Sequence, residues 1–153
     1  MIGLDIKLGE FEVLVKKVDN GRSVWEKNLT LVLKGKGSED FLMFAKVFEG
    51  YSYYRPWVEL FSINPEPLGL RFFGSEIERE IYRRIYEFLP KLGRIFVEYY
   101  EDRETLYTLR RGEEPDKSRM GRVLFEVGFR NLRNWYYPEG LREGGQKISG
   151  EKL

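Results

Sequence analysis

The chain has 153 residues, 42% of them hydrophobic and 33% charged, a size and composition typical of one globular domain with a single core. It contains no cysteine and no histidine, which excludes disulfide frameworks, Cys/His zinc sites, cysteine nucleophiles and Ser-His-Asp triads. The net charge of +1 does not point to a nucleic-acid or membrane partner.

The N-terminus lacks a basic segment followed by an apolar one, and the longest apolar runs are too short to cross a bilayer. We therefore expect a cytoplasmic protein. The chain has 20 Glu and 15 Arg but a single Gln, a pattern associated with hyperthermophiles, so we also expect a thermophilic source.

The first half of the chain shows the alternation of apolar and polar residues that is typical of β-strands. Leu29, Leu31 and Leu33 fall on one face, while residues 41–49 are apolar on both faces, as in a central strand. A turn signal, DNG, lies at residues 19–21. These patterns predict strands over residues 11–18, 23–33, 41–49 and 57–63.

The second half carries helix signals. Ser75 and Glu78 form a capping box that starts a helix over residues 75–90. Pro115 suits the first turn of another helix over residues 115–129, and Gly128 suits its left-handed end. The remaining segments are predicted as strands over 94–100 and 130–137, a helical turn over 104–112, and a final strand or flexible tail over 141–153.

The predicted fold class is α/β (α+β), a mixed, mostly antiparallel sheet covered by helices, in a single domain of residues 1–153. This order of elements resembles the GCN5-related N-acetyltransferase (GNAT) fold, where the fifth strand leads into a helix that ends in Gly-Phe. The segment VLFEVGF, residues 123–129, is similar to that helix end, and the resemblance covers residues 41–137. It implies a GNAT-like fold and an acyl-CoA-dependent N-acyltransferase, with acetyl-CoA or another acyl-CoA as the cofactor.

The loop before the first predicted helix reads RFFGSE, residues 71–76, and resembles the Arg/Gln-x-x-Gly-x-Gly/Ala turn of the GNAT family. In that family, backbone N–H groups and the helix dipole hold the pyrophosphate of acyl-CoA. The resemblance therefore implies that Arg71, Gly74 and Ser75 bind the cofactor.

Two positions depart from the family pattern. Glu76 stands where the family has a small residue and adds negative charge at an anion site, and Leu124 stands where many members have a proton-donating tyrosine. These departures favour the alternative of a non-catalytic small-molecule or protein-binding module that has lost CoA chemistry. A third alternative is RNA binding, with four arginines and two aromatic residues as the contacts: Arg119, Arg122, Arg130, Arg133, Trp135 and Tyr136.

Three C-terminal segments, RETLYTLRRGEEP, SRMGRVLFEVGF and NWYYPEGLREGGQK, also resemble a family of uncharacterised archaeal proteins that is a domain of unknown function. That resemblance implies a single domain and no particular activity.

An acidic cluster, VEYYEDRET, lies where a predicted strand ends and a helix begins, a position where open α/β sheets collect ligands. Glu98 is the predicted catalytic residue, a general base for a substrate amine. The cluster could instead bind Mg²⁺ or be structural, with Asp102 capping the next helix. We predict no metal site.

Aromatic and acidic residues near two glycine-rich turns suggest a pocket for a small-molecule ligand. The predicted substrate-binding residues are Tyr54, Trp135, Tyr137, Glu139, Glu143 and Gln146. The aromatic loop around Tyr54 could also form half of a homodimer contact, and the C-terminal turns could simply close the fold.

Overall fold

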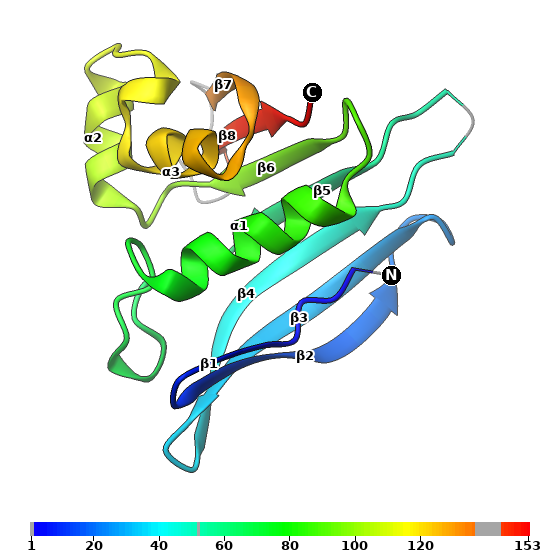
Figure 1. The fold of residues 1–153 in the computed structure, drawn as a ribbon, viewed down its shortest axis with the longest axis vertical. Coiled ribbons are helices and arrows are strands. Elements are labelled where there is room, and N and C mark those ends of the chain that lie inside the picture. The colour runs from blue at the N-terminus through cyan, green and yellow to red at the C-terminus, as the bar shows by residue number, and fades with distance from the viewer. Residues whose placement is uncertain (1, 52, 137–144) are drawn as a thin grey trace.

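The computed structural model describes residues 2–51, 53–136 and 145–153 (Figure 1). Within these residues, no helix is both long and apolar enough to cross a membrane. The strands are β1 (Ile6–Leu8), β2 (Phe11–Asn20), β3 (Glu26–Gly35), β4 (Ser38–Phe48), β5 (Trp57–Phe61), β6 (Arg94–Glu98), β7 (Arg130–Tyr136) and β8 (Gln146–Glu151). The α-helices are α1 (Glu76–Phe88), α2 (Arg103–Arg110) and α3 (Arg119–Val127), and the 3-10 turns are η1 (Pro67–Gly69) and η2 (Pro115–Lys117).

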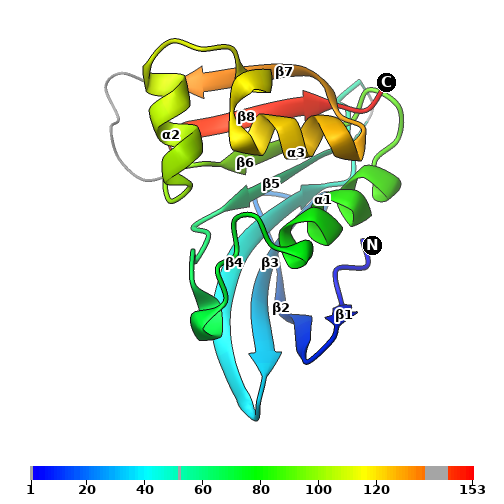
Figure 2. The same cartoon turned by 60° about the vertical axis from the view of Figure 1, so that its left-hand side comes forward.

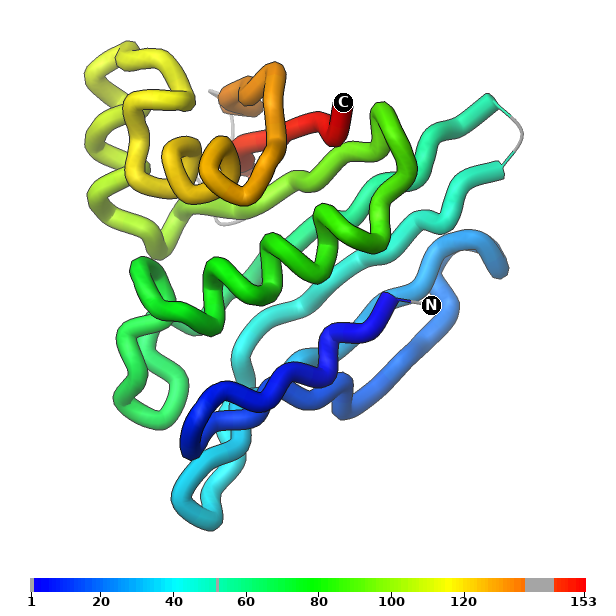
Figure 3. Tube along the Cα trace, in the orientation of Figure 1, coloured from blue at the N-terminus to red at the C-terminus, as the bar shows by residue number. Residues whose placement is uncertain are grey.

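The strands form one eight-stranded sheet in the order β1-β2-β3-β4-β5-β6-β8-β7. The first five strands make an antiparallel meander, which the Cα trace shows in blue to teal (Figure 3). Helix α1 carries the chain to β6, which pairs parallel to β5 with Trp57 opposite Arg94 and Leu60 opposite Val97. Strand β8 lies between β6 and β7 and is antiparallel to both.

Helices α1 and α3 lie side by side over one face of the sheet (Figures 1 and 2). Val58 and Leu60 of β5 are buried on that face in one apolar core with Ile81 and Ile85 of α1. Full burial of an aliphatic side chain of this size contributes about 1.5–3 kcal/mol. The alternate side chains, such as Trp57, lie on the opposite face and are half-buried, because no helix of the described chain covers it. We call this second surface the open face.

The predicted fold class is confirmed: the sheet is mixed and mostly antiparallel, with only β5 and β6 parallel among the described strands. Ser75 caps α1 as predicted, since its hydroxyl accepts a hydrogen bond from the Glu78 amide at 3.2 Å. The predicted start of the helix over 115–129 is wrong. Pro115 opens the separate turn η2, and Ser118 caps α3 by accepting from the Gly121 amide at 3.0 Å.

Strand β1 was not predicted, because its three residues are too few to show alternation. Of the segment predicted as a strand or tail, residues 146–151 form β8, whereas 141–144 lie outside the described residues. The finer prediction of a GNAT-like arrangement stays a prediction.

Candidate functional site

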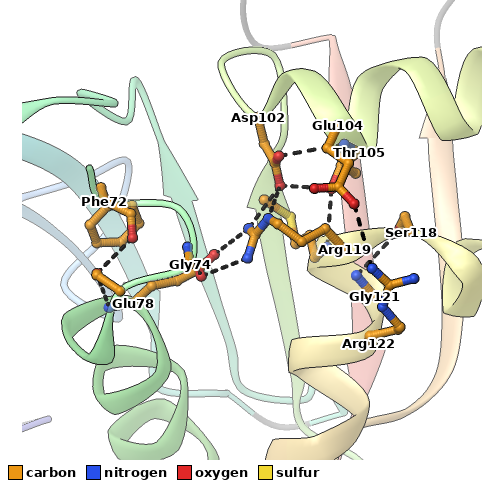
Figure 4. A network of polar contacts seen from close by, with 12 residues as sticks. Phe72, Gly74, Glu78, Asp102, Glu104, Thr105, Ser118, Arg119, Gly121 and Arg122 are labelled. Carbon is orange, nitrogen blue, oxygen red and sulfur yellow. Dashed lines mark hydrogen bonds and ion pairs between the residues drawn. The ribbon is translucent and has the colours of Figure 1, made fainter.

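Three helix N-termini meet around the guanidinium of Arg119, at the carboxyl ends of β5 and β6 (Figure 4). Arg119 donates to both carboxylate oxygens of Glu78, at 2.8 Å and 2.6 Å, and to Oδ2 of Asp102, at 3.1 Å and 2.8 Å. Glu78 and Asp102 are 1% and 3% exposed, so both carboxylates are withdrawn from water. We call these three side chains the three-helix ion network.

The local sequence places each member of this network. Glu78 lies in the first turn of α1, Asp102 is the N-cap of α2, and Arg119 is the first residue of α3. Carboxylates are stabilised at helix N-termini by the helix dipole and by free backbone N–H groups. Asp102 accepts from the amide and hydroxyl of Thr105, and the Thr105 hydroxyl in turn accepts from the Met120 amide at 3.0 Å.

The pKa shifts of Arg119 and Tyr82 show how the groups in and around the network stabilise one another. Burial by itself would lower the pKa of Arg119, but the hydrogen bonds and charges of Glu78 and Asp102 outweigh it and raise that pKa above its usual value. Burial and the neighbouring Glu78 carboxylate raise the pKa of Tyr82 well above its ordinary value, so Tyr82 stays a neutral donor to Glu78 at 2.9 Å. Every oxygen of the two carboxylates has a partner, which is typical of a structural cross-link.

The predicted cofactor loop borders this network, and three of its backbone N–H groups are already engaged. The Gly74 amide donates to Glu78 Oε1 at 2.9 Å, the Ser75 amide donates to the Phe72 carbonyl at 3.0 Å, and the Phe72 amide donates to the Pro65 carbonyl at 2.9 Å. The Glu78 carboxylate thus lies where the implied pyrophosphate would need a backbone donor (Figure 4). Gly74 has φ +96°, a conformation that favours glycine.

Arg71 is exposed and lines a pocket of about 260 Å³ between the loops that follow β5 and β6. The lining is strongly charged, with acidic and basic side chains mixed: Glu66, Arg71, Glu101, Asp102, Arg103, Glu104 and Arg119. In the described part of the chain, no group of three or more acidic side chains is placed to hold a metal ion.

Glu98, the predicted base, is 3% exposed at the end of β6. Pairing between β5 and β6 ends at Leu60 and Val97, and the Glu98 carboxylate accepts from the Ser62 amide at 3.2 Å just beyond that point. Ser62 has φ +50°, a strained backbone conformation for a residue other than glycine. A role for Glu98 as a base stays a prediction.

The structure separates the predicted substrate-binding residues. Trp135 lies on the open face, where its indole N–H donates to the Ser149 hydroxyl at 2.7 Å. Gln146 points to the helix side and is fully buried, and neither atom of its side-chain amide has a hydrogen-bond partner among the described residues. Tyr137, Glu139 and Glu143 lie outside the described residues.

A small pocket of about 200 Å³ lies between α2 and β7, near Gln146. Tyr99 donates its hydroxyl to Asn134 Oδ1 at 2.6 Å there, and burial raises the pKa of Tyr99 to about 12. The Tyr99 amide donates to the Gln146 carbonyl at 3.1 Å, which ties β8 to this pocket. The phenol therefore acts as a neutral hydrogen-bond donor at neutral pH.

Tyr54 belongs to a different and larger feature, a groove of about 1000 Å³ that we call the aromatic groove. The β2–β3 turn, the end of β4, the following loop and the start of β5 form it, with the side chains of Arg22, Ser23, Trp25, Glu26, Lys46, Phe48, Tyr51, Tyr54 and Trp57. Of these, only Tyr54 was predicted as a site residue. The alternation of Phe44, Lys46 and Phe48 in β4 was an available signal for Lys46 and Phe48, because it puts these side chains on the face away from the core.

Aromatic contacts continue from the groove across the open face. Trp57 meets Phe96 of β6 edge-on with ring centroids 6.4 Å apart, and Phe96 meets Trp135 of β7 at 6.2 Å. Trp57 begins β5 and Phe61 ends it, so the aromatic groove and the three-helix ion network lie at opposite ends of a strand about 13 Å long. The predicted site residues are therefore divided among at least three places.

A mixed, mostly antiparallel eight-stranded sheet with helices on one face places this chain among the α/β proteins. The chain belongs to the family DUF1122, described as proteins of unknown function, whose model matches residues 9–153. A solved structure of a protein of unknown function from Aquifex aeolicus VF5 is similar over 99% of this chain and 77% of that chain, with 43% identity and a TM-score of 0.84. No curated protein matches the chain. The predicted membership of an uncharacterised family is confirmed, while an archaeal, thermophilic source stays a prediction.

Proposed function

We propose that this protein is a non-catalytic small-molecule-binding module whose ligand binds in the aromatic groove. It would keep an acetyltransferase-like order of elements and would have lost the chemistry of acyl-CoA. The observation that carries the proposal is the Glu78 carboxylate, which takes the Gly74 amide that a bound pyrophosphate would need.

Three further features support the loss of CoA binding. Moving the Glu78 carboxylate off the Gly74 amide would break its contacts with Arg119 and Tyr82 at a buried position, where a carboxylate without partners is costly. Glu76 adds a negative charge in the first turn of α1. Leu124, which occupies the position of the family's proton-donating tyrosine, is fully buried and carries no proton donor.

The aromatic groove supports the binding half of the proposal. Ligand pockets are mostly apolar, with a few polar groups that fix orientation, and their volumes are about 300–1000 Å³. The volume of the groove is at the upper end of that range, whereas the pocket beside Arg71 is smaller and lined mostly by charged side chains. It is also lined by five aromatic side chains that remain partly open to solvent.

Two measurements on the purified protein test this function. Calorimetric titration with CoA and acetyl-CoA should show no binding that Arg71→Ala removes, even at millimolar ligand. A thermal-shift screen of small molecules should give hits that are lost in Tyr54→Ala and kept in Tyr53→Ala, because Tyr53 is 97% exposed on the same loop and does not line the groove. Ligand at about 100 times its Kd stabilises the folded state by about 2.7 kcal/mol.

An N-acyltransferase is the second candidate, favoured by the parallel β5–β6 pair and its α1 crossover. Open α/β sheets bind ligands beyond the carboxyl ends of parallel strands, and Arg71 lines a pocket there. This candidate uses Arg71, Gly74 and Ser75 for acyl-CoA and Glu98 as the base, and it requires the Glu78 carboxylate to leave the Gly74 amide.

The two candidates give opposite results in the same titration. Micromolar binding of acetyl-CoA that is lost in Arg71→Ala and unchanged in Tyr54→Ala would overturn the non-catalytic proposal. Glu98→Gln should then abolish acyl transfer to an amine while leaving the affinity for acetyl-CoA in place.

A further inference from the structure

Two stacked pairs of rings come together in the aromatic groove. Trp25 and Tyr51 have ring centroids 5.1 Å apart and planes at 27°, and Phe48 and Trp57 have centroids 5.6 Å apart and planes at 23°. With Tyr54, these rings come from the β2–β3 turn, the end of β4, the following loop and the start of β5. Their π-faces are suited to stacking with another flat ring.

The backbone holds these rings in place. Phe48 and Trp57 are directly opposite each other in the β4–β5 ladder, and the Glu49 amide donates to the Trp25 carbonyl at 3.1 Å. Tyr51 and Tyr54 exchange backbone hydrogen bonds at 2.9 Å and 3.3 Å, which closes the loop between the strands. Preorganised rings lose little conformational freedom when a ligand binds.

The charges that line the groove favour an anion. Arg22 is exposed, and no ion pair engages its side chain anywhere in the described ranges. The Lys46 ammonium lies 5.5 Å from the centroid of the Phe61 ring. Glu59, which is opposite Lys46 in the β4–β5 ladder, forms its ion pair with Lys147 instead. The one acidic side chain of the lining, Glu26, already accepts the Arg22 backbone amide at 3.0 Å.

We propose that the aromatic groove binds a planar aromatic ring that carries an anionic group, the chemistry of a nucleoside monophosphate. The base stacks on the rings of the groove, and Arg22 and Lys46 bind the anionic group. This inference rests on the proposed function, because it names the class of ligand for the same groove.

A set of simple ligands separates the parts of this recognition. Adenosine monophosphate and uridine monophosphate carry both ring and anion, adenosine carries the ring alone, inorganic phosphate the anion alone, and tetramethylammonium is a cation that aromatic rings also bind. Calorimetry and quenching of tryptophan fluorescence report binding, since Trp25 and Trp57 are two of the three tryptophans of the chain. We expect both nucleotides to bind more tightly than adenosine, and phosphate and tetramethylammonium to bind weakly.

Variants assign the binding to the groove. Tyr54→Ala should weaken nucleotide binding by about fivefold or more, the lower end of the effect of removing one stacking ring. Arg22→Gln should weaken the nucleotides but leave adenosine unchanged. Tyr53→Ala and Arg55→Gln are the matched controls, because these exposed residues are on the same loop as Tyr54 and do not line the groove. Tyr54 is 72% exposed, so its replacement does not threaten folding.

Equal affinity for adenosine and its monophosphate, tighter binding of tetramethylammonium, or equal effects of the variants and their controls would each overturn the inference. If other small molecules still bind in the groove, the proposed function survives without it. CoA itself carries an adenine nucleotide, so any binding of CoA is assigned by whether Tyr54→Ala or Arg71→Ala removes it. Loss only in Arg71→Ala, with no ligand in the groove, overturns both proposals.

Discussion

Replacing Arg119 by methionine should destabilise the protein strongly. Methionine has a similar length and fills much of the same space, so the substitution mainly removes charge and hydrogen bonds. It leaves the Glu78 and Asp102 carboxylates, 1% and 3% exposed, without their shared cation. The Gly74 amide and the Tyr82 hydroxyl still bind Glu78, but neither carries a charge that can offset it.

The expected cost follows from the burial of the pair. Removing one partner of a buried ion pair costs about 3–5 kcal/mol, because the remaining charge is uncompensated. For a chain of 153 residues, about 1 kcal/mol shifts the melting temperature by about 2–4 °C. Arg119→Met should therefore lower the melting temperature by about 6–20 °C.

Arg122→Met is the matched control, since it lies on α3 one turn after Arg119. Its ion pair with Glu104 is 3.5 Å long, with both side chains more than half exposed, and such pairs contribute about 0–1 kcal/mol. Urea unfolding of both variants measures the difference directly. Adding Glu78→Gln to Arg119→Met should recover part of the lost stability, because it removes one unpaired charge. Equal losses in the two single variants, or no recovery in the double variant, would refute this account of the network.

Four other substitutions have defined outcomes. Burial raises the pKa of Tyr99 from 10.0 to about 12, so its neutral phenol contributes stability that is fully present below pH 10 and lost as the pH rises through about 12. In urea unfolding over this pH range, the free energy of unfolding of Tyr99→Phe should therefore fall by about 2 kcal/mol less than that of the unsubstituted protein. Gly121→Ala should destabilise the fold, although alanine is the better helix former, because its Cβ would lie 1.8 Å from the Pro115 carbonyl oxygen. Gly112→Ala, which meets no atom within 4 Å but has φ +80°, should cost only about 1 kcal/mol by thermal unfolding, and equal losses would contradict the steric explanation. Ser75→Ala should cost about 1 kcal/mol in the same assay through loss of the α1 cap, and an unchanged melting temperature would contradict that role.

Elements with local signals could be predicted from the sequence. The cap of α1 and the end of α3 at Gly128 depend on residues within one turn of each other, and the alternation in β3 is visible in its leucines. The order of strands could not be predicted in the same way. Strand β8 pairs with β6, whose residues precede it by about 50 positions, and no local pattern encodes such a pairing.

The same distinction applies to the candidate site. The capping box predicts that Glu78 lies in the first turn of α1, but its partner Arg119 is 41 residues further along the chain. The Glu78 side chain therefore forms an ion pair across helices and accepts a hydrogen bond from the Gly74 amide. It does not return to the Ser75 amide, although the capping box alone suggests that contact. An isolated Glu in a cap gives no information about such a partner.

Only part of the aromatic groove could be predicted from the sequence, for a related reason. Tyr51 and Tyr54 lie in one loop and Trp57 begins the strand that follows it, so their proximity is local. Trp25 and Phe48 join them only through the registers that put Phe48 opposite both Glu26 and Trp57. A shift of β4 by one residue would turn Phe48 into the core and remove a wall of the groove. The aromatic groove thus depends both on the local sequence of the loop, which supplies Tyr51 and Tyr54, and on the strand registers, which bring Trp25 and Phe48 beside them.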